Sequence, residues 1–509
     1  MKLESRAWWE AAGAVLASIV ALPSLAYPLG RDQAVYFYVA REWLHRGSVV
    51  YKDVFEHKTP GIYVIYTAAM ALLGEHVWIV RAVEIPLVLG GGWLAAACVD
   101  RTLGAYTPGL RGAAMLAASI LHYGFLGFWD TGQCEIWCVA FVLASLVLAR
   151  PDRAVLSGLC AGCALLVKPT SLPLTAVVAW RLWRVERRAT SLGLFAAGAA
   201  APTLAAALYL AHRGALGSAI DVLVHANLQY VANENVGGVS DAVTRILDVT
   251  RLYLPLSLVI VYGAIASWLR ARKKGDDARA DVYALALSLG AAGFLSVCLQ
   301  LKFYVYHFEM MAAGGVLAAV ALMRDAFSAL AARAIPPAAR QAIVAGHLLG
   351  LFAISWVGEH QWFRYARDAA LMGVGVIDRE RFARDFRVES AHFDEGASEL
   401  VASWLRAHAR PGDELCVRSF EPQVYVLTGM RCASRFFWTA WITDVRRVYR
   451  REEWLAEDRA ALEQSRPRFV TVKAEANGGV DQEPYFSAMG YVRRATIGEF
   501  YVLELGGVP

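Results

Sequence analysis

The chain has 509 residues, of which 57% are hydrophobic and only 19% are charged, and its mean hydropathy is +0.40. These values lie outside the range of ordinary soluble domains and indicate a polytopic α-helical membrane protein. The net charge of +5 is small for this length, so nucleic acid is not expected as a partner.

Apolar runs follow one another from the N-terminus to about residue 358, although several are shorter than the ~20 residues of an ideal span. Arginine and lysine gather in alternate connecting loops, such as "RLWRVERR" (181–188) and "RARKKGDDAR" (270–279), which places those loops in the cytosol. With a cytosolic N-terminus, the pattern predicts about 11 transmembrane helices. It puts on the outer face residues 28–60, 130–135, 212–250, 300–307 and 360–509.

From about residue 385 the composition is that of a water-soluble domain, and we predict two domains with a boundary at residues 359 and 360. Residues 1–359 form a transmembrane module, and residues 360–509 read as a small, water-soluble α/β domain. In the latter, "EGASELVASWLRAHARPGD" predicts an amphipathic helix, "ELCVRSF" and "RFVTVKA" predict strands, and "YVRRATIGEFYVLEL" predicts a terminal hairpin. Cys416 and Cys432 both lie in this exported and therefore oxidising region, so we expect a disulfide between them.

The first outer loop, "GRDQAVYFYVAREWLHRGSVVYKDVFEHKTPG" (30–61), holds more charge than a simple connection needs. Its first half predicts an amphipathic helix that lies in the membrane surface and ends at Gly47. Asp32 precedes this helix and could simply be its N-cap, and Lys58 could be an interfacial anchor. The apolar run at 61–74 is too short to span, so we interpret it as a juxtamembrane or half-inserted helix.

Ionisable residues gather on the predicted outer rim of the bundle. They are Asp32, Asp53 and Lys58 in the first loop, Asp130 and Glu135 in the second, and Lys302 and His307 in a later one. A carboxylate there could accept a hydroxyl proton, while lysine and histidine could stabilise a phosphate as negative charge builds on it. This combination beside lipid is suited to glycosyl transfer from a lipid phosphate.

The segment "GRDQAVYFYVAREWLHRG...VYKDVFEHKTPGIYVIY...LLG.....VRAVEIPL" resembles the first loop of the polyprenyl-phosphate-dependent GT-C glycosyltransferases. The resemblance is nearest to the RgtA/B/C/D-like membrane sugar transferases and more distant to the protein mannosyltransferase and aminoarabinose transferase groups. It covers roughly residues 8–330, and its most specific part is the acid beyond the first span followed by Y-x-D-x-x-x-x-K-x-P. It implies a GT-C fold with juxtamembrane helices on the outer face.

The resemblance also implies roles for individual residues. Asp32 matches the loop carboxylate, which is the base or the group that orients the acceptor. Asp130 or Glu135 matches the acidic position of the second loop, and Lys58 matches the lysine that meets phosphate. Lys302 and His307 are further candidates for binding the donor phosphate. Gln33 stands where many relatives carry a second acid, which leaves Asp32 to act alone or with Asp53.

The implied activity is that of an inverting glycosyltransferase in the cytoplasmic (inner) membrane, with its active site and C-terminal domain outside the cytoplasm. A polyprenyl-phosphate-linked hexose or pentose would be the donor, and a glycan, lipid or protein hydroxyl the acceptor. No cofactor or metal is expected, although the ligand types leave a divalent metal between Asp32 and Asp130 as an open alternative.

Two other classes of protein remain as alternatives. A transporter or lipid flippase of the cell-envelope glycan pathway would also contain broken helices and intramembrane charges, but it should show an inverted repeat. A non-catalytic assembly factor would use the bundle only as an anchor, which does not account for so many spans. The identity of the sugar, the acceptor and the isoprenoid length depends on pocket shape and cannot be predicted from these residues.

Overall fold

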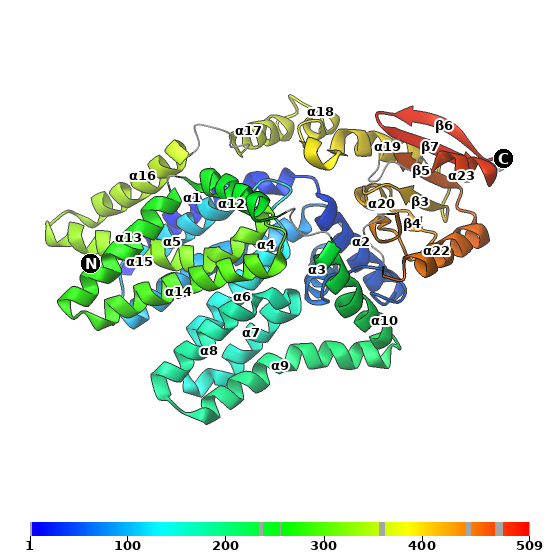
Figure 1. The fold of residues 1–509 in the computed structure, drawn as a ribbon. Coiled ribbons are helices and arrows are strands. Elements are labelled where there is room, and N and C mark those ends of the chain that lie inside the picture. The colour runs from blue at the N-terminus through cyan, green and yellow to red at the C-terminus, as the bar shows by residue number, and fades with distance from the viewer. Residues whose placement is uncertain are drawn as a thin grey trace. The chain divides into compact units, whose positions relative to one another are not determined.

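The computed structural model describes residues 3–233, 238–254, 256–355, 362–443, 449–473 and 482–507, and most of these residues are helical (Figure 1). The chain forms two compact units. Unit 1 comprises residues 1–26, 80–206 and 236–364, and unit 2 comprises residues 27–79, 207–235 and 365–509. The first outer loop thus belongs to the same unit as the C-terminal region, a grouping that differs from the predicted division at residue 359.

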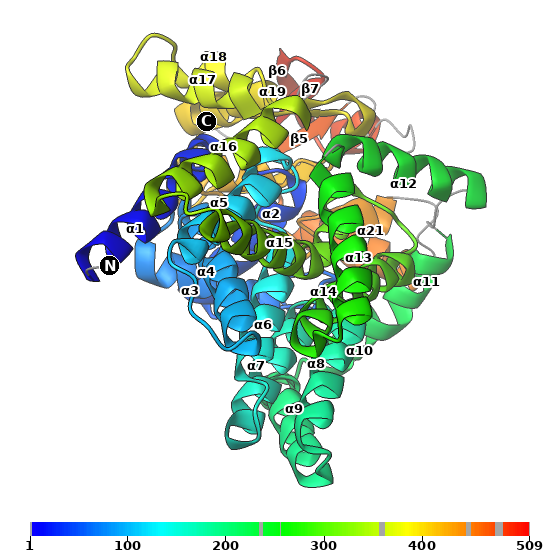
Figure 2. The same ribbon diagram turned by 90° about the vertical axis from the view of Figure 1, so that its left-hand side faces the viewer.

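Unit 1 is a bundle of apolar helices, and Figure 2 shows α13, α14 and α15 packed side by side. Its helices are α1 (Leu3–Ala21), α4 (Ile79–Thr102), α5 (Leu110–Ser119), α6 (Cys134–Leu148), α7 (Ala154–Val167), α8 (Leu172–Glu186), α9 (Ala189–His212, which continues into unit 2), α12 (Val239–Tyr253), α13 (Leu256–Lys274), α14 (Asp277–Gln300), α15 (Ala312–Ala332) and α16 (Pro337–Ser355). Short 3-10 or π-helical turns flank several of them, including η2 (Ile120–Gly124), η4 (Pro169–Ser171) and η6 (Val305–Met311).

Among the described residues, five helices are long and apolar enough to cross a membrane. They cover Trp8–Ala26, Ile79–Thr102, Ala189–His212, Asp277–Gln300 and Val305–Ala332, and a sixth span would arise if α12 and α13, which meet at 91°, act as one. The polytopic helical fold is therefore confirmed. The full number of spans and their orientation stay predictions, because α5 to α8 have only 10 to 15 residues each.

Unit 2 contains the first-loop helices and a five-stranded sheet. Its helices include α2 (Arg31–Arg46), α3 (Gly61–Leu73), α19 (Glu395–His408), α20 (Gln423–Thr428) and α22 (Arg451–Ser465). The sheet has the order β4-β3-β5-β7-β6, in which β4, β3 and β5 are parallel and β5, β7 and β6 are antiparallel. The strands are β3 (Glu414–Arg418), β4 (Arg431–Cys432), β5 (Phe469–Lys473), β6 (Tyr491–Ile497) and β7 (Phe500–Leu505).

The predicted α/β elements of the C-terminal region are confirmed. "EGASELV" begins α19, "ELCVR" forms β3, "FVTVK" forms β5, and the last two strands pair as an antiparallel hairpin. Short elements complete the unit: α10 (Leu216–Ile220), α11 (Asn227–Asn233), α17 (Trp362–Gly373, from Tyr365 onward), α18 (Arg379–Ala383), α21 (Ala440–Thr443), α23 (Glu483–Ala488), β1 (Arg387–Val388) and β2 (Phe393–Asp394).

Helix α2 corrects one expectation from the sequence. It does end at Gly47, but Arg31 and residues 33–42 are all buried, so its polar side does not face the membrane surface. Arg41 instead donates hydrogen bonds to the carbonyls of Tyr425 (3.1 Å) and Met430 (3.0 Å). The C-terminal domain therefore supplies the polar partners that water or lipid headgroups were expected to supply.

The predicted disulfide between Cys416 and Cys432 is not present in the structure, where both thiols are free. Leu415 pairs with Cys432 across the parallel strands, and successive residues in a strand point to opposite faces. Cys416 and Cys432 therefore face opposite sides of the sheet. Cys416 packs in an apolar cluster, whereas the Cys432 sulfur accepts a hydrogen bond from the hydroxyl of Tyr425 at 3.1 Å.

Helices α7 and α9 approach each other through glycine residues. A Cβ atom on Gly198 would lie 2.2 Å from the carbonyl oxygen of Val155, and one on Gly162 would lie 2.3 Å from that of Ala199. Contacts this short are possible only without a side chain, so glycine sets the distance between the two helices.

We expect Gly198→Ala to lower the apparent melting temperature of the protein in detergent, because overpacking of this kind costs ~1–3 kcal/mol. Gly193→Ala, on the same helix, is the matched control, since nothing lies within 4 Å of its Cβ position. That control should be neutral or stabilising by up to ~1 kcal/mol through helix propensity. Equal melting temperatures for the two variants would contradict the close approach.

Candidate functional site

Unit 1 contains a half-open cavity of about 480 Å³ whose wall is mostly apolar. Its lining comes from α4, α6 and α12 to α15, with residues such as Leu87, Leu143, Ile260, Val261, Phe294 and Val316. His122 and Glu309 bring ionisable groups to the same wall. The volume and lining are those of a site for an apolar ligand that carries a polar end.

His122 lies between two buried carboxylates. Its Nδ1 atom is hydrogen-bonded to Glu309, and its Nε2 atom lies 3.3 Å from an oxygen of Glu84. Glu84 also accepts hydrogen bonds from the backbone N–H of Gly132 (2.6 Å) and the hydroxyl of Tyr123 (3.3 Å). Glu84 lies on α4. Its hydrogen bond with Gly132 therefore holds the loop after η2 against the helical bundle.

Asp130 lies in that loop, beside the same cluster. Burial, followed by the negative charge of Glu309, raises the pKa of Asp130 from 3.8 to about 7. Arg81 holds the loop from α4, because its guanidinium donates to the carbonyl of Phe128 (3.1 Å) and to the hydroxyl of Thr131 (3.3 Å). A carboxyl group with this pKa changes its charge near neutral pH.

A second group of ionisable residues surrounds Glu135 in the first turn of α6. Glu135 is fully buried and forms an ion pair with Lys168, which lies at the break between α7 and η4. The Nε2 atom of His307 in η6 is 4.0 Å from Glu135, and the Lys168 ammonium lies 5.9 Å from the ring centre of Tyr306. A lysine and a histidine thus approach one carboxylate.

Lys302 is buried in the turn between α14 and η6. Its carbonyl oxygen accepts a hydrogen bond from Arg245 of α12 at 3.2 Å. The backbone on either side is unusual, since Leu301 and Phe303 have φ angles of 54° and 51°. This contact and the tight turn fix the backbone of Lys302 at the end of α14.

The predicted residues Asp32, Asp53 and Lys58 lie in unit 2. Asp32 occupies the first turn of α2, whose N-cap is Gly30, so Asp32 is not the N-cap. Asp53 accepts a hydrogen bond from the backbone N–H of Val49 at 2.8 Å and closes the turn that follows α2. For Asp53, the structure therefore shows a structural contact.

Glu56 holds the segment that contains Lys58. It accepts hydrogen bonds from the backbone N–H of Lys58 (2.8 Å) and from the Tyr63 hydroxyl, and it contacts His57 Nδ1 at 2.6 Å. Burial alone would raise the pKa of Glu56, but His57 and Lys58 outweigh it and lower this pKa to about 2. The buried carboxylate thereby fixes the backbone on which Lys58 stands.

Comparisons with known proteins agree with this architecture. The model of Glycosyltransferase family 87 matches residues 63–299. The crystal structure of ArnT from Cupriavidus metallidurans bound to undecaprenyl phosphate superimposes over 98% of both chains, with a TM-score of 0.56 and 16% sequence identity. The apo state of the same protein gives a TM-score of 0.57 and 14% identity, again over 98% of both chains. No curated protein sequence matches the chain.

The chain has the GT-C glycosyltransferase fold. The resemblance seen in the first loop is therefore confirmed, and with it the multi-pass membrane architecture. Because the identity to ArnT is low, the likeness establishes the fold, and the roles of individual residues must rest on their own contacts.

Within the GT-C bundle, the structure brings Asp130 and Glu135 close to ionisable residues that were not predicted. Among these residues, His122, Lys168 and Glu309 were not singled out from the sequence. They stand singly inside or beside apolar helices, where a lone polar residue has no local signal of its partners. Intramembrane charge itself was the available signal, because such residues are rare unless they are functional or paired.

Asp130→Asn offers a test of this electrostatic environment. A raised pKa means that the protonated Asp130 stabilises the fold fully below its unfolded value of 3.8, and that this stability is lost as the pH rises to about 7. The variant should therefore gain apparent melting temperature relative to the wild type between pH 4 and 7, and the difference should stay constant above that range. A difference independent of pH would show that Asp130 is already charged in acid.

Proposed function

We propose that this protein is an inverting glycosyltransferase that moves a sugar from a polyprenyl-phosphate donor to an acceptor hydroxyl on the outer face of the cytoplasmic membrane. The observation that carries the proposal is the mostly apolar cavity of unit 1, whose wall also includes the buried His122 and Glu309. An isoprenoid phosphate likewise combines a long apolar chain with one charged group. The structure of ArnT with undecaprenyl phosphate is of a protein with this fold, and it supports the choice of lipid.

In this proposal the isoprenoid chain lies in the cavity, and the phosphate is held at the polar edge of the bundle. Lys302 and His307 of unit 1 would bind the phosphate and stabilise the charge it acquires when the sugar leaves. Lys168 is a further cation next to His307, but Glu135 already neutralises it. No cofactor is required in this scheme.

Asp32 would act as the base. It would accept the proton of the acceptor hydroxyl, while that oxygen attacks the anomeric carbon from the face opposite the phosphate and inverts its configuration. The acid cluster around His122, with Asp130 and Glu84, would order the loop that borders the donor site. The positive-inside pattern of the loops supports an outward-facing reaction, where the sugar must arrive on a lipid rather than on a nucleotide.

Asp32→Asn should lower kcat about 10²–10⁴-fold in proteoliposomes supplied with a labelled polyprenyl-phosphate sugar, because general-base catalysis contributes a factor of that size. The exposed Asp152→Asn, on a surface turn, is the matched control and should retain activity. If Asp32→Asn transfers sugar at the wild-type rate, Asp32 is not the base.

Filling the cavity should weaken binding of long donors. Gly290 on α14 and Gly315 on α15 both line it, and nothing lies within 4 Å of either Cβ position, so the backbone at both positions has room for a Cβ atom. Gly290→Leu should raise KM for a long-chain donor more than for a short-chain analogue that leaves the cavity unfilled. Gly346→Leu, which is equally unhindered but is outside the cavity lining, is the control. Equal KM changes for both chain lengths would mean that the lipid lies elsewhere.

A further inference from the structure

The first turn of α2, which carries Asp32, is held by a buried ion network from the C-terminal domain. Arg31 is the first residue of α2, and its Nη2 atom donates to the carbonyl of Ala391 (2.7 Å) and to the carboxylate of Glu421 (2.8 Å). The guanidinium lies 5.7 Å from the ring centre of Phe420 and 6.0 Å from that of Phe393. Every one of these partners lies more than 350 residues away in the sequence.

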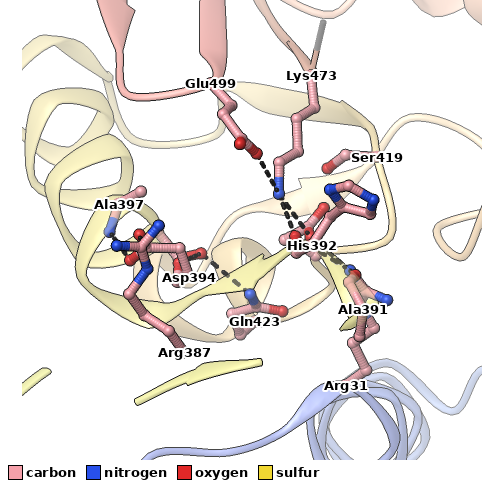
Figure 3. Close-up of polar contacts among 12 residues, drawn as sticks. Arg31, Arg387, Ala391, His392, Asp394, Ala397, Ser419, Gln423, Lys473 and Glu499 are labelled. Atoms are coloured by element: carbon pink, nitrogen blue, oxygen red, sulfur yellow. Dashed lines mark hydrogen bonds and ion pairs between the residues drawn. The ribbon is translucent and has the colours of Figure 1, made fainter. Parts of the chain in front are cut away.

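Glu421 is shared between two cations. Lys473, the last residue of β5, reaches the same carboxylate oxygen at 3.3 Å and also contacts the carbonyl of His392 and the carboxylate of Glu499 (Figure 3). The side chains of Glu421 and Lys473 are only 1% and 2% exposed. Burial alone would raise the pKa of Glu421, but Arg31 and Lys473 lower it, so the carboxylate stays charged.

The network lies where three parts of the C-terminal domain meet. Glu421 is in the turn between β3 and α20, and Lys473 ends β5. Ala391 and His392 lie in the connection between β1 and β2, and Phe393 begins β2. Figure 3 shows Arg31 entering from α2 on one side and Lys473 entering from β5 on the other. A displacement of any of these segments would leave a buried charge without its partner, which is strongly unfavourable.

The rest of α2 is docked in the same way. Tyr38 stacks on Phe437 with ring centres 4.3 Å apart, and its hydroxyl accepts the backbone N–H of Cys432 at 3.0 Å. Together with Arg41, these contacts fix the rotation and the axial position of the helix. Arg31 adds the contact nearest to Asp32, since the two residues are adjacent in the first turn.

We propose that Arg31, Glu421 and Lys473 are positioning residues, through which the C-terminal domain sets the placement of Asp32 for proton transfer. The inference rests on the proposed function, in which Asp32 is the base. It gives the C-terminal domain a part in the chemical step itself, whereas an appended acceptor-binding module would affect only acceptor affinity. Small errors in placing a catalytic group reduce rate steeply, so loosening the first turn should be visible in kcat.

Glu421→Gln keeps the shape of the side chain and removes its charge. We expect kcat to fall at least tenfold, KM for donor and acceptor to change less than twofold, and hydrogen exchange in the peptide covering residues 28–40 to become faster. Arg31→Lys keeps the positive charge but loses the several N–H donors of the guanidinium. Its kcat should therefore lie between those of the wild type and Arg31→Met. In the double variant of Arg31→Met and Glu421→Gln, the fold-losses in kcat of the two single variants should not multiply, because both substitutions break the same network.

Asp458→Asn is the matched control. Asp458 pairs with Arg418 in the same domain, with side chains 1% and 4% exposed, but this pair does not include a residue of α2. The control should lower the melting temperature while leaving kcat per folded molecule and exchange in residues 28–40 unchanged. If both variants lose activity only in proportion to folded protein, or if Glu421→Gln retains wild-type kcat, the positioning role is overturned.

Failure of the proposed function would look different. In that case the wild type and Asp458→Asn would not transfer sugar, or Asp32→Asn would be fully active. The hydrogen-exchange measurement would still report whether the network holds α2. Should Glu421→Gln not fold, the Arg31 series gives the same comparison of kcat with exchange. An unchanged exchange rate in Arg31→Met would overturn the proposal on its own.

Discussion

A charge that leaves water needs a partner, and this requirement governs both units of the protein. In unit 1, Glu84, Glu135 and Glu309 are buried in a largely apolar bundle, and each contacts histidine or lysine. In unit 2, Arg31 and Lys473 share Glu421 in the same way. Isolated buried charges would cost several kcal/mol each, so such pairs restrict which segments can lie together.

The partners are far apart in sequence, which explains why the candidate site was only partly predictable. The helical fold, the short α/β domain and the helix after Asp32 follow from periodicity and composition, and they agree with the structure. Asp130 and Glu135 stood out because they lie in a short polar turn. His122 and Glu309 did not stand out. The sequence around each of them does not indicate that η2, which carries His122, contacts η6, which carries Glu309.

Helix α2 shows the opposite case, in which a strong local pattern suggested the wrong environment. Its apolar stripe matched an interfacial helix, yet Gln33 is buried as deeply as Val35 and Val39, and Arg41 is also buried. An amphipathic pattern shows that two faces of a helix differ, but it does not say whether water, lipid or protein covers the polar one. The backbone carbonyls of Tyr425 and Met430 take the place of water here, and no pattern within α2 could have indicated them.

The disulfide expected between Cys416 and Cys432 is absent for a related reason. Strand pairing decides whether two sulfur atoms face each other, and an oxidising compartment alone does not bring them together.

The same small residues that bring helices together also leave room for a ligand. On α14 and α15, a Cβ atom on Gly314 would lie 2.3 Å from the backbone nitrogen of Gly290, so the two helices touch at that point. Gly315, the next residue, has nothing within 4 Å of its Cβ position and lines the cavity. Glycine therefore acts in two ways on one helix: it permits close contact on one side and removes side-chain volume on the other. A bundle built in this way can be tightly packed and still contain a cavity with a mostly apolar wall, to which His122 and Glu309 add ionisable groups.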